Sequence, residues 1–420
     1  MARVTAVRTM TLRGPRNHEG GGAKRTIPKF IIRIDTDDGH YGLGECDYGG
    51  NEYFFGVAEA VQYLASYLVG RDPLCIRPFI SEMLYGALPP YPENPGWEAG
   101  EPSRPKHAPS LSATATQTGP LVWAMSGVET ALCDLAGKLL DIPVYTLLGG
   151  KFRDHVHVYL DRSHPDDLTD PDAWKRMAQG VVDLGFDRLK FDVEQIAPEA
   201  TQDSWNRSIS RPQLRHIVER LGFVRTAVGP DVSITLDCHM QYHVTDAVQL
   251  ADAVAPIGIS WLEDPTPITN PDALAEVRAG SPIPICAGEM LVPEEFRTFI
   301  DRHAMDIIHP DILFVGGLHE AQKVGQYAEL HYIPMAMHGN GGCLATIAAA
   351  HVAAATRNFL TLEYHFIETP WIGAYVRRVD GLPLFEHGGI PLSAVPGLGV
   401  ELDPAVCDAR FHEGERIYEH

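Results

Sequence analysis

The first 140 residues combine strand-like and helix-like patterns. Apolar and polar side chains alternate along residues 4 to 12 and 28 to 46, and Asp38-Gly39 within the second stretch is a hairpin-turn signal. From Val57 to Leu68 the apolar residues recur at helical spacing, and they do so again from Met125 to Leu139, before Pro143. We therefore predict an α+β domain over residues 1 to 140 that contains a small antiparallel sheet.

Residues 86 to 120 interrupt this domain without any periodic pattern. They are rich in Pro, Gly, Ser and Thr, a composition that is typical of loops. Loops of this length inside a compact domain are often lids or disordered segments. We therefore predict one long loop here.

From His155 onward the pattern changes to strands that alternate with helices. The first strand lies in VHVYLDRS, the last lies in NFLTLEYH, and we count eight strand candidates between these limits. A right-handed strand–helix repeat closes most naturally into a parallel barrel with the helices outside. We predict an α/β fold, a modified TIM barrel of the (β/α)7β type, over residues 150 to 366. The turn-rich tail, residues 367 to 420, is expected to return and complete residues 1 to 140 as a capping domain.

Six acidic or histidine residues follow the later strands at a nearly constant interval. The steps between them are 26, 26, 22, 27 and 25 residues, each long enough for one strand, one helix and two loops. In a parallel barrel such residues meet at the C-terminal mouth, where barrel enzymes carry out their chemistry. They are Asp237, Glu263, Glu289, Asp311, His338 and Glu363.

The first three of these residues predict a metal site. Asp237, Glu263 and Glu289 come from successive strand ends, so their carboxylates would repel one another unless a cation neutralised them or their pKa values rose. An oxygen-only set suits a hard ion such as Mg²⁺. A helix cap or an ion pair explains any one of these carboxylates more simply, but three at matched positions favour the metal.

The next residues suggest proton transfer. A carboxylate such as Asp311 that holds one imidazole nitrogen leaves the other free as a base near neutral pH, although His338 taken alone is as readily a structural histidine. Lys190 ends the second strand and would place an ammonium opposite His338, while Glu363 ends the eighth.

His239 lies two residues after Asp237 and therefore points into the same mouth. It is either a proton donor to a leaving group or a hydrogen-bond partner of a metal ligand. The sequence weights these two interpretations equally.

Charge and cysteine usage narrow the partners. A formal net charge of -21 argues against nucleic acid and anionic membranes, which require clustered cations. The seven cysteines form no CxxC pairs, so neither a disulfide framework nor a zinc ribbon is indicated. Arg3 and Arg8 interrupt the amino terminus before an apolar signal region forms, and residues 344 to 355 are too short to span a bilayer. We expect a cytoplasmic protein with a small-molecule substrate.

Taken together, the motifs resemble the enolase superfamily and, within it, the mandelate-racemase-like acid-sugar dehydratases. The resemblance covers nearly the whole chain. It implies that Mg²⁺ binds the three carboxylates, that His338 and Asp311 form a catalytic dyad, that Glu363 hydrogen-bonds the substrate carboxylate, and that the protein forms homo-oligomers from dimers to octamers. The motifs that carry it are GLGEC, ALCDLAGKLLDIPVYTLLGG, Asp237, Glu263 with Asp264-Pro265, Gly288-Glu289, Pro310-Asp311, Gly316-Gly317, His338 and Glu363.

Two departures refine the resemblance. Racemases of the group carry Lys-x-Lys on the second strand, whereas this chain has Lys190-Phe191-Asp192, which disfavours two-base racemisation. The sequence Asp237-Cys238-His239 is similar to the galactonate-type dehydratases, in which the histidine assists departure of the β-hydroxyl. His309 stands before Pro310, where glutamine is common, and we assign it no function.

The expected reaction is Mg²⁺-dependent dehydration of an aldonate, such as galactonate or gluconate, to a 2-keto-3-deoxy acid through an enediolate. The alternatives are an epimerase, a cycloisomerase or an aldarate dehydratase that uses the same intermediate, and a non-catalytic ligand sensor. The complete set of base, dyad, metal ligands and Lys190 argues against the sensor.

Substrate identity is not readable from the sequence because specificity in such folds lies in loops. We expect Asp192, Lys190, Glu363 and Arg162 to contact the substrate. Arg162, at the first strand end, would either hold the distal carboxylate of a diacid or form a salt bridge at the rim. Further candidates in the capping domain are the 86 to 120 segment, His18, Glu19, Asp47 and Tyr48.

Overall fold

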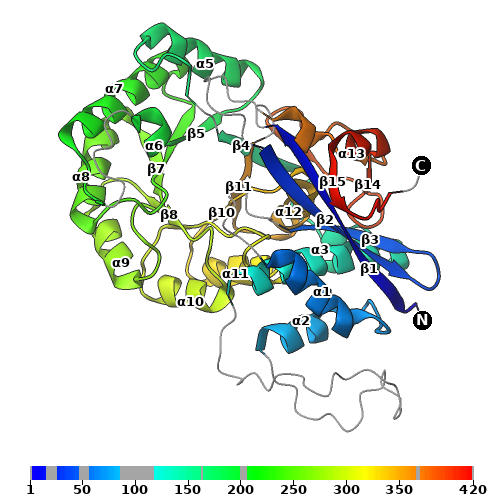
Figure 1. Ribbon diagram of the computed structural model, residues 1–420. Helices are drawn as coiled ribbons and strands as arrows, with labels where there is room; N and C mark the ends of the chain where they lie inside the picture. Colours follow the sequence, from blue (N-terminus) through cyan, green and yellow to red (C-terminus); the bar gives the residue numbers. More distant parts are fainter. Residues whose placement is uncertain are drawn as a thin grey trace.

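The computed structural model describes residues 2–15, 26–46, 56–85, 118–161, 164–198, 206–365 and 369–418. A parallel barrel with outer helices stands beside a capping domain of strands and helices (Figure 1). This arrangement confirms the predicted fold class. Arg162, His18, Glu19, Asp47, Tyr48 and residues 86–117 of the predicted loop lie outside the described residues.

The capping domain is built on an antiparallel sheet in the order β15-β1-β2-β3. Its elements are β1 (Val4–Pro15), β2 (Thr26–Thr36), β3 (Tyr41–Cys46), α1 (Val57–Leu68), α2 (Ile76–Tyr85) and α3 (Pro120–Leu140). The two glycines of GLGEC let this sheet lie directly on α3, because a Cβ at Gly42 or Gly44 would come within 2.1 Å of an α3 carbonyl oxygen. The turn between β2 and β3 contains the predicted Asp38-Gly39 signal.

The barrel contains eight parallel strands in sequence order, closed by pairing between β11 and β4. The strands are β4 (His155–Asp161), β5 (Arg188–Asp192), β6 (Ser233–Asp237), β7 (Ile259–Glu263), β8 (Ile285–Ala287), β9 (Ile307–Ile308), β10 (Met335–Met337) and β11 (Phe359–Tyr364). Because all eight run in the same direction, their carboxyl ends form one mouth.

Helices connect consecutive barrel strands and cover the outside (Figure 1). They are α5 (Pro171–Asp183), α6 (Val193–Ile196), α7 (Arg211–Val228), α8 (Val244–Val254) with η2 (Ala255–Ile257), α9 (Pro271–Gly280), α10 (Pro293–Asp301), α11 (Leu318–Leu330) and α12 (Cys343–Ala355). Asp170, Ser210 and Asn270 cap α5, α7 and α9 with their side chains, and each of these helices has proline in its first turn.

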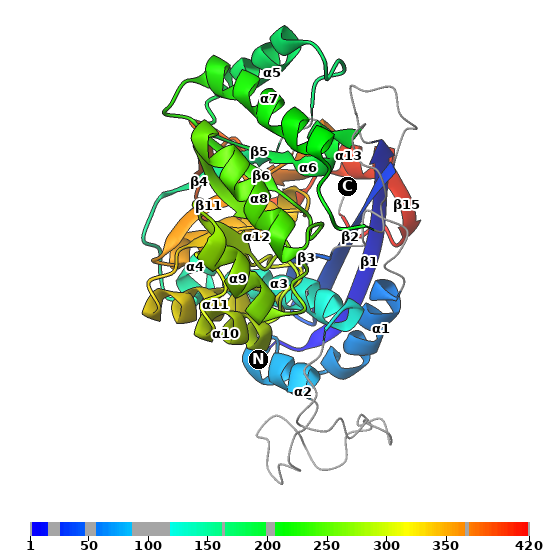
Figure 2. The ribbon, with the colours of Figure 1, turned by 90° about the vertical axis from the view of Figure 1, so that its left-hand side faces the viewer.

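Helix α12 joins the two parts of the molecule. Every one of its residues is buried, because it packs against β11 of the barrel on one side and against β3 of the capping sheet on another (Figure 2). Burial on all sides explains its apolar, alanine-rich sequence. Within the described ranges, each helix is too short or too polar to cross a bilayer.

The tail contacts both parts. Strand β15 (Phe411–Gly414) joins the capping sheet beside β1, whereas β13 (Gly389–Pro391) pairs antiparallel with the first residues of β4. The predicted return to the capping domain is therefore made by β15, and the domain boundaries at residues 140, 150 and 366 stay predictions. The other elements outside the barrel are α4 (Val144–Leu147), η3 (Pro370–Gly373), β12 (Val376–Arg378), β14 (Val400–Leu402) and α13 (Pro404–Arg410).

Candidate active site

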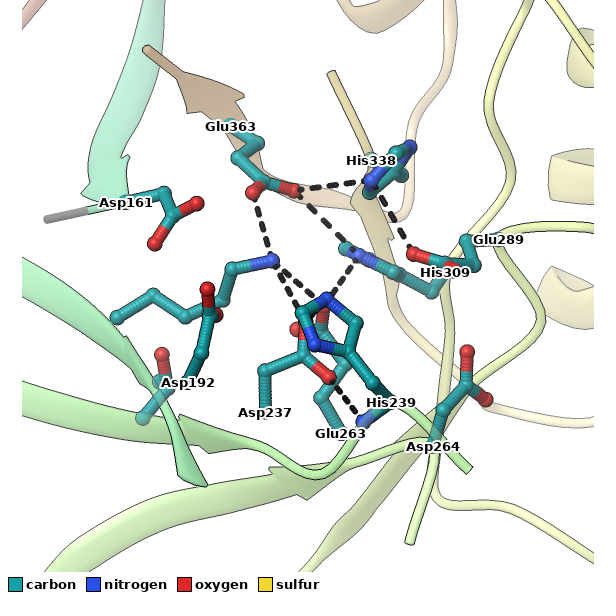
Figure 3. Close-up of polar contacts among 12 residues, drawn as sticks. Asp161, Asp192, Asp237, His239, Glu263, Asp264, Glu289, His309, His338 and Glu363 are labelled. Atoms are coloured by element: carbon teal, nitrogen blue, oxygen red, sulfur yellow. Dashed lines mark hydrogen bonds and ion pairs between the residues drawn. The ribbon is translucent and has the colours of Figure 1, made fainter. Parts of the chain in front are cut away.

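The mouth of the barrel brings the predicted site residues together around one buried ammonium (Figure 3). The Lys190 side chain is 2% exposed, and its Nζ lies 3.1 Å from Asp237 Oδ2, 2.7 Å from Glu263 Oε1 and 2.6 Å from Glu363 Oε1. Burial disfavours the charged ammonium, but the surrounding carboxylates, Glu263 and Glu363 foremost, outweigh it and raise the pKa of Lys190 well above its usual value. Lys190 is therefore a fixed cation at the centre of the mouth.

The three predicted metal ligands converge. One carboxylate oxygen from each of Asp237, Glu263 and Glu289 lies within 4.8 Å of the others. Burial and the charge of Glu263 raise the pKa of Asp237 well above its usual value. The pKa of Glu263 falls well below normal, because His309 and Lys190 outweigh the effect of its burial. This oxygen-only set, with a carboxylate whose charge is poorly compensated, fits a hard divalent ion such as Mg²⁺.

His338 and Asp311 form a hydrogen-bonded pair at the ends of β10 and β9. His338 Nδ1 lies 2.7 Å from Asp311 Oδ2, and Asp311 Oδ1 accepts a hydrogen bond of 2.7 Å from the Leu313 backbone N–H. His338 Nε2 is left facing the mouth, 3.2 Å from Glu289 Oε2. Burial lowers the pKa of His338, but the charges of Glu289 and Glu363 outweigh it and raise the pKa to about 9.

His239 forms a second histidine–carboxylate pair, with a partner that sequence reasoning missed. His239 Nδ1 lies 2.6 Å from Glu194 Oε1, and Nε2 lies 3.3 Å from Asp237 Oδ2. Glu194 lies on α6, and its other oxygen accepts a hydrogen bond of 3.0 Å from Gln241. His239 has a φ of 42°, uncommon for a non-glycine residue, and its backbone N–H donates to Asp237 Oδ1 at 2.9 Å. The turn therefore fixes the histidine against Asp237, a predicted metal ligand, and against Glu194.

Comparison with known proteins places both parts of the chain. Residues 173–406 match the family model described as Enolase C-terminal domain-like, and residues 3–149 match the model described as Mandelate racemase / muconate lactonizing enzyme, N-terminal domain. The chain belongs to this family of the enolase superfamily.

Two relatives and one solved structure illustrate the similarity. A D-xylonate dehydratase from Haloferax volcanii is 35% identical over 93% of this chain and 87% of its own. A D-galactarolactone cycloisomerase from Agrobacterium fabrum is 29% identical over 96% of this chain and 97% of its own. The crystal structure of a mandelate racemase/muconate lactonizing enzyme-like protein from Rubrobacter xylanophilus superposes with a TM-score of 0.83, at 35% identity and 98% coverage of both chains.

His309, where the enolase-superfamily resemblance leads one to expect glutamine, lies beside the predicted metal ligand Glu263. It is fully buried, with Nδ1 3.0 Å from the Ala336 carbonyl oxygen and Nε2 3.1 Å from Glu263 Oε1. Nε2 is also 3.6 Å from Glu363 Oε2. His309 therefore links a predicted metal ligand to the carboxylate that ends the eighth strand.

Glu45, the acid of GLGEC, is a further residue that the sequence did not single out. It is 1% exposed, and its two oxygens accept hydrogen bonds from the backbone N–H groups of Gly342 at 2.6 Å and Ala345 at 3.1 Å. Lys29 Nζ donates to the Asn340 carbonyl oxygen at 3.0 Å. Two capping-domain side chains in this member of the family thus hold the loop that follows His338.

Asp192 lies at the end of β5. The residue is 5% exposed, and its carboxylate faces the mouth near His239 and Asp237. Arg162, the fourth predicted substrate contact, lies outside the described residues. The structure thus gathers all the other predicted site residues at the mouth, and it adds Glu194, His309 and Glu45.

Proposed function

We propose that the protein is a Mg²⁺-dependent acid-sugar dehydratase that converts an aldonate to a 2-keto-3-deoxy acid. The observation that carries the proposal is the presence of two histidine–carboxylate pairs, His338 with Asp311 and His239 with Glu194, on either side of one carboxylate triad. Removal of an α-proton and departure of a β-hydroxyl need a base and an acid at separate positions. The names of relatives support the same chemistry, since they include D-xylonate dehydratase and D-galactonate dehydratase.

We propose that the carboxylates of Asp237, Glu263 and Glu289 hold the metal. When bound there, Mg²⁺ supplies positive charge that offsets the negative charge developing on the substrate carboxylate. Lys190, already within 3.1 Å of two of these ligands, supplies a second positive charge in the same buried site.

His338 Nε2 takes the α-proton. Asp311 holds the Nδ1 proton, so Nε2 is the nitrogen that faces the mouth. The raised pKa of His338 comes first from the charge of Glu289, which a metal ion held by Glu289 would offset, so the metal would favour the neutral base. Proton removal leaves an enediolate, whose charge faces Lys190.

The resemblance implied that Glu363 hydrogen-bonds the substrate carboxylate. An ionised Glu363 has no proton to donate, so it cannot make that hydrogen bond. Lys190, His338 and His365 outweigh its burial and hold its pKa well below normal. We therefore propose that Glu363 acts by orienting Lys190.

His239 completes the reaction. It donates a proton to the 3-hydroxyl, the C3–O bond breaks, and water leaves. The enol that remains takes up a proton at C3, loses the proton of its C2 hydroxyl and becomes the 2-keto-3-deoxy acid. Glu194 accepts the Nδ1 proton of His239, so Nε2, which lies 3.3 Å from Asp237 Oδ2, is the nitrogen whose proton passes to the 3-hydroxyl in this proposal.

A cycloisomerisation through the same enediolate is the second candidate, because the Agrobacterium relative named D-galactarolactone cycloisomerase aligns with 96% of this chain. The test is incubation of the purified protein with Mg²⁺ and a panel of aldonates, aldarates and their lactones, followed by assay for 2-keto acids and NMR of the products. A 2-keto-3-deoxy acid supports the dehydratase, and an isomer of the starting acid without loss of water supports the second candidate. If an acid binds but gives neither product nor α-proton exchange, the result would instead support a non-catalytic ligand sensor.

A further inference from the structure

Three side chains on one side of the mouth have no role in the proposed proton transfers. Asp161 ends β4, Asp192 ends β5, and His365 follows β11. These strands are neighbours, because β4 pairs with β5 at Asp161 and Lys190 and with β11 at Leu160 and Tyr364. Figure 3 shows Asp161 and Asp192 on the side of the site away from His338 and Glu289.

His365 connects Asp161 to the rest of the site. Its Nδ1 lies 3.2 Å from Asp161 Oδ2, and its Nε2 lies 2.9 Å from Glu363 Oε1. With both nitrogens facing carboxylates, the ring is held in one orientation. His365 thereby fixes the position of Asp161 relative to Glu363, the carboxylate that contacts Lys190.

Asp192 has an oxygen that lacks a donor. The Gln195 amide donates to Oδ2, whereas Oδ1 is buried without a hydrogen-bond partner in the part of the chain that the structure describes. The carboxylate points into the mouth, since one of its oxygens lies within 4.8 Å of ligand atoms of Asp237 and His239. A buried carboxylate oxygen without a donor is costly. A ligand that brings a hydroxyl group would satisfy it.

The charge on this side disfavours a second anion. Asp161, Asp192 and Asp237 end three neighbouring strands, and Asp192 lies beside Asp237, so a substrate carboxylate placed here would face acidic side chains from all three strands. Lys190 Nζ lies within 3.1 Å of Asp237, Glu263 and Glu363, and the proposed mechanism already uses its charge for the reacting end of the substrate. A polyol chain offers donors here, whereas a carboxylate offers only acceptors and negative charge.

We propose that Asp161, Asp192 and His365 form a hydroxyl-binding subsite that selects aldonates, with one carboxylate, over aldarates, with two. Asp161 and Asp192 accept hydrogen bonds from substrate hydroxyls remote from the reacting carboxylate, and His365 is a positioning residue for Asp161. The proposal rests on the proposed dehydratase function. It also competes with one of the two roles that the sequence left open for Arg162, that of holding the distal carboxylate of a diacid.

The test measures binding separately from turnover. D-galactonate and galactarate have the same configuration at C2 to C5 and differ in the group at C6, and D-gluconate and D-glucarate form a second pair. Their dissociation constants are measured by calorimetry with Mg²⁺ in His338→Asn, which cannot remove the α-proton. We expect the preferred aldonate to bind roughly 10- to 100-fold more tightly than its aldarate. This is the difference in affinity that one hydrogen bond to a charged group typically makes. Introducing Asp161→Asn or Asp192→Asn should lower this ratio by about 10-fold.

A matched control exists at the other end of the same strands. Asp187 precedes β5, and its carboxylate oxygen lies 2.7 Å from His157 Nε2 of β4. Asp187→Asn therefore removes a carboxylate from a histidine pair on β4 and β5 without touching the mouth, and it should leave the ratio unchanged. His365→Gln should lower the ratio less than Asp161→Asn, because it displaces the carboxylate without removing its charge.

Equal binding of the two acids, or binding of neither, would overturn the subsite. A diacid preference that Arg162→Gln abolishes would also overturn it, in favour of the expectation for Arg162. Turnover by the unmodified protein distinguishes failure of the proposed subsite from failure of the proposed dehydratase function. Dehydration with a binding ratio near one overturns only the subsite, whereas the expected ratio without α-proton exchange or dehydration supports the subsite and overturns the dehydratase.

Discussion

The two histidine–carboxylate pairs differ in how firmly the fold holds them. The His338 side chain is 9% exposed, stacks near Phe314, and precedes a loop that Glu45 and Lys29 hold from the capping domain. The His239 side chain is 40% exposed, and its partner Glu194 lies on the four-residue helix α6. A base that removes the same α-proton from every substrate benefits from rigid burial. An acid that acts on a particular hydroxyl and releases water lies better at an open edge.

The largest effect is expected at the buried pair. His338→Asn should abolish both exchange of the α-proton with deuterated solvent and formation of 2-keto acid, because no enediolate forms without the base. NMR of the substrate in D2O measures exchange, and a 2-keto acid assay measures dehydration. Exchange that survives this substitution would move the base to another residue and remove the basis of the comparison.

His239→Asn should show whether His239 donates a proton to the leaving group or only forms a hydrogen bond to a metal ligand. The base and Lys190 remain, so α-proton exchange should continue while 2-keto acid production falls by roughly 10² to 10⁴-fold. If exchange is lost while the metal still binds, the roles of the two histidines are reversed. If dehydration is unaffected, His338 performs both proton transfers and His239 only holds Asp237.

The repeating part of the fold made one set of residues predictable. Each barrel unit has nearly the same length, so residues at matching points of the repeat meet at the mouth, as Asp237, Glu263 and Glu289 do. His239 was predicted at the mouth because side chains two residues apart on a strand share one face. The structure does place it at the mouth, but in a turn with a φ of 42° after β6 has ended, so the turn and not the strand orients it. His365, two residues after Glu363, could have been found in the same way and was not.

Contacts between non-repeating elements could not be predicted in this way. Glu45 lies 297 residues before Gly342, the backbone group that it binds, and no periodicity relates β3 to the loop after β10. Glu194 reaches His239 from a short helix inserted after β5, so the contact depends on the local course of the chain. The burial of His309 beside Glu263 likewise depends on packing within the barrel rather than on spacing.

The contact of Glu45 with the loop after His338 should affect proton removal by His338. Glu45→Gln keeps the size of the side chain but replaces one of its two accepting oxygens with an NH2 group, which cannot accept a hydrogen bond. It also removes the negative charge that lies 3.8 Å from Lys29 Nζ. Because this loosens the loop after the base, exchange and dehydration should fall together, by roughly 10- to 100-fold, with a smaller change in KM. Glu401→Gln, at a tail carboxylate near Tyr41 and Lys138, is a control that should leave both rates unchanged. A fall in dehydration alone would show that Glu45 does not act through His338.

Glu194→Gln should give a smaller effect on the open side. The glutamine carbonyl still accepts the His239 Nδ1 proton, but the charge that orients the ring is gone. Dehydration should therefore fall by about 10-fold, within the range for residues that orient a functional group, while exchange remains at the level of the unmodified protein. Equal losses of exchange and dehydration would mean that α6 supports the whole mouth rather than His239.

The smallest effect concerns the stability of the buried side across pH. Glu129 of α3 contacts His319 and also accepts hydrogen bonds from the backbone N–H groups of Leu318 at 2.7 Å and His319 at 3.3 Å, so it holds the start of α11, a few residues after Asp311. Burial favours the neutral form of both side chains, but their contact favours the charged form of each and outweighs the burial. The contact therefore lowers the pKa of Glu129 and raises the pKa of His319.

These two directions set the pH window. A raised histidine pKa stabilises the fold fully below its unfolded value, near 6.5, and the contribution is lost as the pH rises through the folded value. A lowered glutamate pKa stabilises above its unfolded value, near 4.3, and is lost as the pH falls through the folded value. His319→Gln should therefore lower Tm by roughly 2 °C more at pH 6 than at pH 9. Thermal melts of both proteins across this range measure the difference, with His331→Gln, a half-buried histidine at the other end of α11, as the control. A Tm difference between the His319 variant and the unmodified protein that does not change with pH would show that the contact holds α11 by packing and backbone hydrogen bonds alone.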